Sequence, residues 1–256
     1  MPQNRKHSGV NGKSVRLGAM RTLFLHGNVG TAADWEPVLS DPALGKLNAF
    51  APNLWEYFRE PRPHSFGDWA EWFCAGLIEG QETALVGYSL GGRLAMHALL
   101  ARPDKFSGAV IISANPGLAD SDQRSSRLSA DCEWASMAAS DWNEFLAQWE
   151  RQPVFDGSAS LPDRNELREW KTEIGASFDA WSLGRQESLL PCLKRIQCPV
   201  LWVSGDRDER FSKLAEKAAG VSTGLRATVD GAGHRVPMDR PIELAVLVRD
   251  FLAALA

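Results

Sequence analysis

The stretch Leu85-Val86-Gly87-Tyr88-Ser89-Leu90-Gly91-Gly92-Arg93 decides the fold of this 256-residue chain. The apolar run that ends at Val86 predicts a buried strand, and residues Leu90 to Ala101 predict a helix. Ser89 therefore lies on a tight strand-to-helix turn, where flanking glycines let backbone and helix approach closely. Such a turn exposes the serine hydroxyl and points the helix N-terminus at it, as a nucleophilic serine requires. The alternative is a structural turn serine.

A second Gly-x-Ser-x-Gly pattern, Gly220-Val221-Ser222-Thr223-Gly224, serves as an internal comparison. It follows a helical stretch and precedes the apolar run 225–229, so the order is helix to strand rather than strand to helix. Because the context is reversed, we predict that Ser222 is a polar loop serine.

Short apolar runs alternate with helical patterns along the chain. Ser65, with Asp68 three residues later, is the predicted N-cap of one helix, and Pro241 opens an amphipathic C-terminal helix. Nearly continuous apolar strands that alternate with helices predict a mostly parallel sheet covered on both faces, a doubly wound α/β architecture. The expected strands are 22–25, 47–51, the run ending at Val86, 109–112, 199–203 and 225–229.

Residues 116–190 interrupt this alternation because they contain no convincing strand. Half of the chain's ten tryptophans lie there, and the segment is too long and apolar for a loop. We expect a helical cap inserted over the carboxyl ends of the strands, where open α/β sheets bind ligands. The α/β core is then formed by 20–115 and 191–256, and residues 1–19 are expected to be a disordered or loosely attached extension.

Composition limits the possible classes of function. A formal net charge of −4 argues against a general nucleic-acid binder but allows a local basic pocket. No apolar segment approaches the roughly 20 residues that a membrane span needs. The four cysteines lack metal-ligand spacing and no dinucleotide fingerprint follows the first strand, so we expect neither metal nor cofactor. We interpret the cysteines as reduced and the protein as cytoplasmic, whereas the sequence does not indicate an oligomeric state.

The partners of Ser89 are expected at the carboxyl ends of later strands. A serine hydroxyl needs a histidine oriented by an acid before it can act as nucleophile or base. His234 follows the last predicted strand, after glycines that leave room for it. Of the two acids after strand 199–203, Asp208 is favoured over Asp206 because it lies farther past the strand end. The remaining histidines, expected to be structural or solvated, are His7, His26, His64 and His97.

The same arrangement predicts two backbone donors for a developing oxyanion. One is the N–H of Leu90 at the start of the helix. The other follows His26-Gly27 and is most simply the N–H of Asn28.

Four motifs stand in a characteristic order: Leu25-His26-Gly27, residues 87–92, Gly205-x-x-Asp208 and Gly233-His234. In this order and spacing they resemble those of the α/β-hydrolase superfamily, over roughly residues 21–255. The resemblance implies the fold and a triad of Ser89, Asp208 and His234. It does not specify the reaction, because this fold hosts many chemistries.

A narrower set of motifs includes Arg93, Pro116-Gly117-Leu118, Gln123-Arg124-x-x-Arg127 and Trp149-x-x-Gln152-Pro153-Val154-Phe155. Together with Gly205-Asp206-Arg207-Asp208-x-x-Phe211 they are similar to the MenH family, the 2-succinyl-6-hydroxy-2,4-cyclohexadiene-1-carboxylate synthases of menaquinone biosynthesis. The resemblance implies that Ser89 acts as a base, that a dienolate forms and that pyruvate is eliminated. It also implies a small carboxylate-bearing substrate bound by Arg93 and Arg127, with Tyr88 and Trp149 lining the pocket.

Two positions depart from the family pattern. Lys171 aligns with a further family arginine; it keeps the charge but loses the forked geometry. The family's Asp-x-Pro-Gly-His-Gly loop is replaced by Pro52-Asn53-Leu54-Trp55-Glu56-Tyr57, which changes one pocket wall.

Charge provides an independent argument about the substrate. Residues 116–190 hold seven Lys and Arg against fourteen Asp and Glu. Such a cap would repel a polyanion unless its arginines converge on the pocket. The alternative is that Arg93 and Arg127 are solvated or paired on helix surfaces and that Trp149 fills the core.

Three functions therefore stay open. The first is the pyruvate-eliminating synthase. The second is a carboxylesterase or related acyl hydrolase that uses the same triad for nucleophilic catalysis, with the aromatic cap as an acyl site. The third is a non-catalytic ligand-binding protein that kept the fold.

Overall fold

A six-stranded, entirely parallel sheet forms the centre of the molecule, in the order β2-β1-β3-β4-β5-β6. The computed structural model describes residues 20–58, 63–77, 79–161 and 163–255, so the expected extension at 1–19 lies outside the described residues. All residues of β3 and β5 are buried, as their continuous apolar runs predict. The strands are β1 (Arg21–Leu25), β2 (Asn48–Phe50), β3 (Thr83–Tyr88), β4 (Phe106–Ile112), β5 (Val200–Gly205) and β6 (Leu225–Val229).

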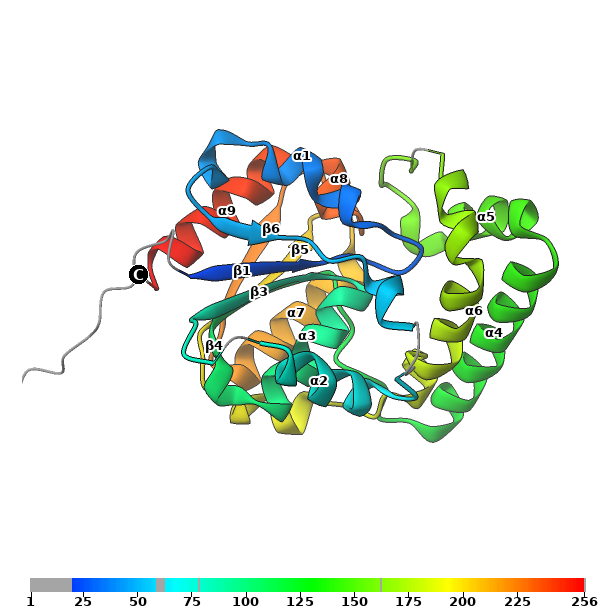
Figure 1. The fold of residues 1–256 in the computed structure, drawn as a ribbon, viewed down its shortest axis with the longest axis horizontal. Coiled ribbons are helices and arrows are strands. Elements are labelled where there is room, and N and C mark those ends of the chain that lie inside the picture. The colour runs from blue at the N-terminus through cyan, green and yellow to red at the C-terminus, as the bar shows by residue number, and fades with distance from the viewer. Residues whose placement is uncertain (1–19, 59–62, 78, 162, 256) are drawn as a thin grey trace, which may run out of the picture.

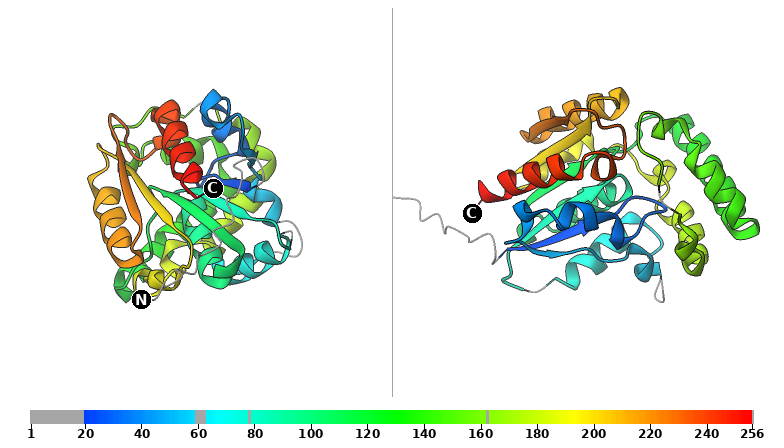
Figure 2. Two further views of the ribbon diagram at one scale, coloured as in Figure 1. Left: turned by 90° about the vertical axis from the view of Figure 1, so that its left-hand side faces the viewer. Right: turned by 90° about the horizontal axis from the view of Figure 1, so that it is seen from above.

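Helices cover both faces of this sheet (Figures 1 and 2). On one face lie α1 (Glu36–Leu39), α8 (Val236–Asp239) and α9 (Pro241–Ala253), which pack an apolar cluster against the strands. On the other lie α2 (Phe66–Ala75), α3 (Leu90–Ala101) and α7 (Glu209–Ser222). The predicted doubly wound architecture is confirmed.

The strand order reverses beside β1, which pairs with β2 on one side and with β3 on the other. At such a switch point the loops after neighbouring strands diverge and leave a crevice at the carboxyl edge of the sheet. The loop after β1 and the turn at Ser89 both border this crevice, so the topology places the expected oxyanion donors beside the serine.

Three α-helices are inserted between β4 and β5, although these two strands pair directly. They are α4 (Ser121–Ser140), α5 (Trp142–Glu150) and α6 (Lys171–Ala180), and they stand together at one end of the sheet (Figure 1). A single bridge between Leu118 and Glu187 joins the start and end of the insertion. We propose that residues 116–190 form one cap unit on a core of 20–115 and 191–256.

The remaining short helices are 3-10 segments in the connections. None of the helices within the described ranges is long and apolar enough to cross a bilayer. Their bounds are Ala32–Trp35, Pro42–Leu44, Leu54–Phe58, Pro103–Lys105, Pro153–Phe155, Asn165–Trp170, Leu183–Arg185 and Leu190–Arg195.

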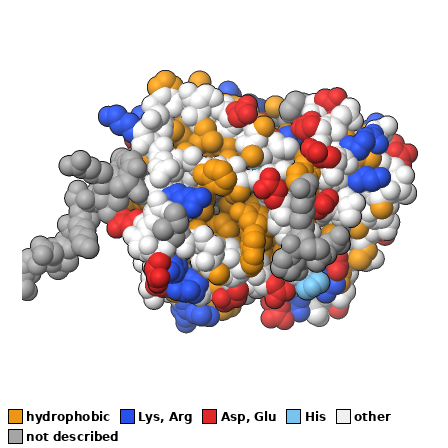
Figure 3. Space-filling view, viewed as in Figure 1, with side chains coloured by type: hydrophobic (Ala, Val, Ile, Leu, Met, Phe, Trp, Pro, Cys, Tyr) orange, Lys and Arg blue, Asp and Glu red, His pale blue; other side chains and the backbone are white. Residues whose placement is uncertain are grey.

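Some apolar surface stays exposed outside the crevice. Hydrophobic side chains gather near the middle of the face shown in Figure 3, between charged groups. Among the described residues, Phe50 and Trp72 are exposed aromatic side chains and line a shallow groove with Tyr57. The lining residues described for this groove are all different from those of the crevice.

The two Gly-x-Ser-x-Gly patterns occupy different contexts, as predicted. Ser89 lies between β3 and α3, whereas Ser222 ends α7 just before β6. The Ser222 hydroxyl donates to the carbonyl of Ala218 and accepts from the indole of Trp202, so it has a local structural role.

Glycines in these two patterns predict opposite stability effects. A Cβ on Gly91 would lie 2.1 Å from the Leu25 carbonyl oxygen, whereas a Cβ on Gly220 would meet nothing within 4 Å. Gly91→Ala should therefore lower the free energy of unfolding by at least about 2 kcal/mol. Gly220→Ala should raise it by about 0.4–1 kcal/mol, because alanine restricts the unfolded chain. Urea denaturation of both variants measures the change in the free energy of unfolding. Equal changes in the two variants would contradict the close packing at Gly91.

Candidate active site

Ser89 has the strained backbone of a sharp strand-to-helix turn. Its φ is 51° and its ψ is −108°, values that residues other than glycine rarely adopt. A Cβ on Gly87 would lie 2.5 Å from the Gly91 carbonyl oxygen, so only glycine allows the chain to fold back this tightly. The N–H of Ser89 donates to the Ile112 carbonyl at 2.9 Å, which ties the turn to β4.

A chain of hydrogen bonds joins Ser89, His234 and Asp208. The Nε2 atom of His234 lies 3.3 Å from the Ser89 hydroxyl oxygen, and its Nδ1 lies 2.9 Å from Asp208 Oδ2. The His234 and Asp208 side chains are only 3% and 9% exposed, so little water competes for these bonds. The structure thus brings Asp208 to His234, whereas Asp206 is exposed.

Asp208 is also the N-cap of α7. Its Oδ1 accepts a hydrogen bond from the N–H of Phe211 at 3.1 Å, while its Oδ2 faces the imidazole. Each carboxylate oxygen therefore has one partner, which fixes the plane of the group. The ring of Phe211 packs against that of His234 with centroids 4.3 Å apart and limits its rotation.

Backbone donors border Ser89 on two sides. Leu90 is the first residue of α3, so its N–H has no partner within the helix. Asn28 lines the same pocket, in the loop after β1. A transition-state oxyanion between them could accept from both N–H groups.

Buried His26 holds the loop that carries Asn28. Its Nε2 accepts from the N–H of Leu54 at 2.9 Å, so Nδ1, 2.8 Å from the Gly27 carbonyl oxygen, carries the proton and donates. Burial lowers the pKa of His26, which keeps the ring neutral and suits it to this pair of bonds.

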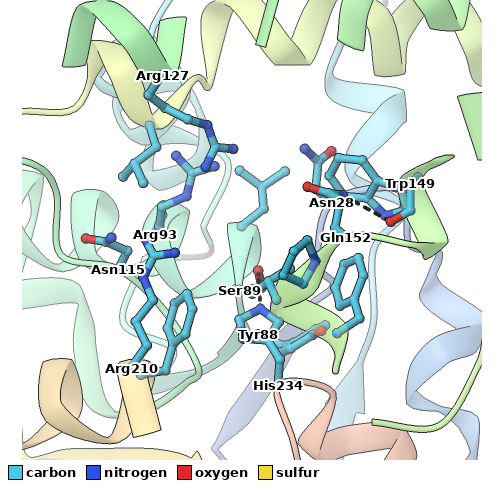
Figure 4. A pocket seen from close by; sticks show the side chains of 16 residues that line it. Asn28, Tyr88, Ser89, Arg93, Asn115, Arg127, Trp149, Gln152, Arg210 and His234 are labelled. Carbon is cyan, nitrogen blue, oxygen red and sulfur yellow. Dashed lines mark hydrogen bonds between the residues drawn. The ribbon is translucent and has the colours of Figure 1, made fainter. Parts of the chain in front are cut away.

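A pocket of about 340 Å³ opens above Ser89 (Figure 4). Its described lining contains three arginines and no aspartate or glutamate, so a neutral or anionic ligand fits it better than a cation. The lining residues are Asn28, Tyr88, Ser89, Leu90, Arg93, Asn115, Arg127, Trp149, Gln152, Pro153, Val154, Phe155, Leu183, Arg210, Phe211 and His234.

Arg93 is a buried cation whose side chain is 8% exposed. Its Nη1 donates to the Gln186 side-chain oxygen at 3.5 Å, and its guanidinium lies 5.1 Å from the Phe66 ring centroid. Within the described ranges it forms no ion pair. Burial, and then repulsion from Arg127, lower the pKa of Arg93 to about 9. A bound carboxylate would supply the missing counter-charge.

Arg127 shares this wall but is already partly neutralised. Its Nε lies 2.9 and 3.0 Å from the two carboxylate oxygens of Asp131. Asp131 is buried and also accepts a 2.7 Å hydrogen bond from the Ser182 hydroxyl. Because Asp131 engages Nε, the two terminal nitrogens of Arg127 stay available to a ligand. The structure therefore brings Arg93 and Arg127 together at the pocket, as expected.

The other expected binding residues divide into two groups. Tyr88 and Trp149 line the pocket and are both buried, and the buried indole N–H of Trp149 has no protein acceptor. Burial raises the pKa of Tyr88, so its phenol stays protonated. Lys171, in contrast, is exposed at the first position of α6 and is absent from the pocket lining. Its expected role is not supported, because this end of α6 faces solvent.

Sequence reasoning missed several residues around the pocket. Arg210 lines it from the first turn of α7, two positions after Asp208. Arg235, next to His234, forms two hydrogen bonds of 2.7 and 2.6 Å with Glu150 of α5. This pair, in which Arg235 is buried and Glu150 is partly exposed, ties the cap to the histidine loop. Such a pair joins residues far apart in sequence, so no local pattern predicts it.

No cluster of metal-binding side chains is present within the described ranges. A serine hydroxyl next to an oriented imidazole can act as nucleophile or as base, and the N–H groups can hold negative charge on an oxygen.

A sequence profile described as the alpha/beta hydrolase family matches residues 22–247, most of the chain. The chain belongs to this family. It is also 36% identical, over 90% of its length, to the 2-succinyl-6-hydroxy-2,4-cyclohexadiene-1-carboxylate synthase of Serratia proteamaculans (strain 568), of which the match covers 92%. The corresponding synthase of Pectobacterium atrosepticum is 32% identical over 90% of this chain and 93% of its own. Within the α/β-hydrolase family, the chain thus falls among the MenH synthases.

Solved structures agree with this assignment of fold. MenH from S. aureus superposes with a TM-score of 0.84 at 20% identity, covering 94% of this chain and 96% of its own. The carboxylesterase CesB from Bacillus subtilis reaches 0.66 at 22% identity, covering 92% and 84%. The predicted α/β-hydrolase fold is confirmed.

Asp208 both orients His234 and caps α7, and two of its variants should separate these roles. In Asp208→Asn the amide oxygen can still accept from the N–H of Phe211, so the NH₂ group faces His234 Nδ1. A donor at this place forces the ring proton of His234 to Nε2. There it prevents Nε2 from accepting the hydroxyl proton of Ser89. We expect activity to fall at least about 100-fold with little change in stability. Asp208→Ala should also lose about 1 kcal/mol of stability with the cap. Kinetics and urea denaturation test this, and an active Asp208→Asn enzyme would contradict it.

Proposed function

We propose that this protein is a MenH-type synthase that eliminates pyruvate from a cyclohexene polycarboxylate by abstracting a proton. The observation that carries the proposal is Arg93, a buried guanidinium in the pocket wall above Ser89 that has no counter-ion among the described residues. A buried uncompensated cation is costly, so it indicates an anionic ligand at that point. The synthases to which the chain is 32–36% identical form, by their names, a cyclohexadiene carboxylate that also carries a succinyl group.

In the proposed mechanism the Ser89 hydroxyl is the base. It takes a proton from the ring carbon beside the succinyl carbonyl while its own proton passes to His234 Nε2, 3.3 Å away. The electron pair moves toward the succinyl carbonyl oxygen and forms a dienolate that includes the ring double bond. Its oxygen accepts from the N–H groups of Leu90 and Asn28. The carbon–oxygen bond to the enolpyruvyl group then breaks, and the imidazolium returns its proton to the departing pyruvate enolate.

Asp208 and the pocket wall have supporting roles in this mechanism. The carboxylate of Asp208 keeps the proton of His234 on Nδ1 and stabilises the imidazolium. Arg93 and Arg127 hold a substrate carboxylate through forked hydrogen bonds and thereby fix the ring over Ser89. Tyr88 and Trp149 complete the wall with one polar hydrogen each.

A carboxylesterase is the second candidate, because the same hydrogen-bond chain can direct Ser89 at an ester carbonyl. The carboxylesterase CesB shares the fold, with a TM-score of 0.66. The charged pocket wall favours the synthase, since an apolar acyl group gains nothing from a buried arginine.

Two parallel assays separate these candidates: pyruvate release from the enolpyruvyl substrate, and hydrolysis of p-nitrophenyl acetate. The wild-type enzyme should release pyruvate rapidly and hydrolyse the ester poorly. Ser89→Ala should lower pyruvate release at least about 100-fold, because it removes the base. Rapid ester turnover without pyruvate would instead identify an esterase. No turnover in either assay, unchanged by Ser89→Ala, would identify a non-catalytic binding protein.

Arg93→Gln tests the substrate side of the proposal. The amide keeps a hydrogen-bond donor near Gln186 but removes the charge, so KM for the enolpyruvyl substrate should rise at least about tenfold, a loss of about 1.4 kcal/mol. Hydrolysis of neutral p-nitrophenyl acetate provides the control and should change much less. An unchanged KM for the polycarboxylate would contradict a carboxylate at Arg93.

A further inference from the structure

A third arginine, Arg210, lines the pocket from outside the cap. It lies on α7, so its position is set by the core rather than by the insertion that supplies Arg127. In Figure 4 the labelled side chains of Arg127, Arg93 and Arg210 follow one wall of the pocket, away from Trp149 and Gln152. Arg210 is exposed and also lines two shallow depressions outside the pocket, which places it at the rim.

The position of Arg210 in its helix is unfavourable for a cation. Asp208 is the N-cap of α7, so Arg210 is the second residue of the first turn, where the helix dipole repels positive charge. Among the described residues it has no acidic partner: its neighbour Glu209 pairs with Lys213, and Asp208 is engaged by His234 and Phe211. Its guanidinium lies 5.6 Å from the Phe211 ring centroid, which orients it without neutralising it.

Arg93 and Arg210 are therefore placed at different depths. Arg93 is buried beside Ser89, and Arg210 is exposed at the rim. A ligand with one carboxylate on its ring and another on a flexible arm can engage both, and Lys171, outside the pocket lining, does not compete for the second.

We propose that Arg210 is a specificity-determining residue that binds the carboxylate on the substrate's flexible arm, while Arg93 and Arg127 bind the one close to the reacting ring. Arg210 thereby supplies the third cation that Lys171 does not. The inference rests on the proposed function for the identity of the substrate, but its test requires binding only.

Isothermal titration calorimetry with two non-reacting probes tests it. One probe, 2-succinylbenzoate, carries a ring carboxylate and an arm carboxylate. The other, 2-butyrylbenzoate, has a methyl group in place of the arm carboxylate. The variants are Arg210→Gln, Arg210→Lys and a matched control, Lys217→Gln, which removes the same charge from an exposed position of α7 outside the described pocket linings.

Arg210→Gln should weaken binding of 2-succinylbenzoate about tenfold and leave 2-butyrylbenzoate unchanged. Arg210→Lys should lie between wild type and Arg210→Gln, because it keeps the charge without the fork. Lys217→Gln should change neither affinity. The inference is overturned if Arg210→Gln lowers the affinity for both probes equally, or for neither. It is also overturned if the wild type does not bind 2-succinylbenzoate.

The outcome is independent of turnover. If the enzyme binds the probes as expected but releases no pyruvate, the proposed reaction fails and the role of Arg210 stands. If pyruvate is released while Arg210→Gln binds both probes normally, the role of Arg210 fails and the reaction stands.

Discussion

The close approach of the turn at Ser89 to the end of β1 is the constraint on which the site depends. With no side chain on Gly91, the start of α3 lies against the carbonyls of Leu25 and His26. This contact places the N–H of Leu90 next to the loop that carries Asn28 and holds Ser89 in its strained conformation. The parallel sheet positions Asp208 and His234 near Ser89, because it brings the carboxyl ends of β3, β5 and β6 to one edge.

The second important feature of the site is Arg93, a cation in the pocket wall whose surroundings do not neutralise its charge. Arg93 contacts a neutral amide and an aromatic ring rather than a carboxylate. Burial lowers the pKa of neighbouring His97 to about 4, so this imidazole stays neutral at pH 7 and adds no positive charge. A bound carboxylate would offset the cost of burying Arg93, so in the proposed function affinity and selectivity for carboxylates arise from the same residue.

Local patterns were sufficient to predict the hydrogen-bonded residues but not the whole pocket. Ser89 and His234 follow strands whose order fixes where they meet, and Asp208 is favoured over Asp206 because it lies farther past the end of its strand. Lys171 does not lie in the pocket wall where it was expected, because the direction of its side chain depends on how α6 packs within the cap. Arg210 was missed although a signal exists: an arginine in the first turn of a helix, next to the acid, opposes the helix dipole. The pairing of Arg235 with Glu150 joins residues 85 apart and has no local signal.

The central claim is that Ser89 acts as a base beneath a carboxylate-binding wall rather than as an acyl nucleophile. Single-turnover release of pyruvate tests it most directly when the substrate is deuterated at the carbon beside the succinyl carbonyl. Proton abstraction by Ser89 predicts slower release from the deuterated substrate and an unchanged protein mass in samples quenched during the turnover. Equal rates for both substrates, with a mass increase that disappears in Ser89→Ala, would contradict the account.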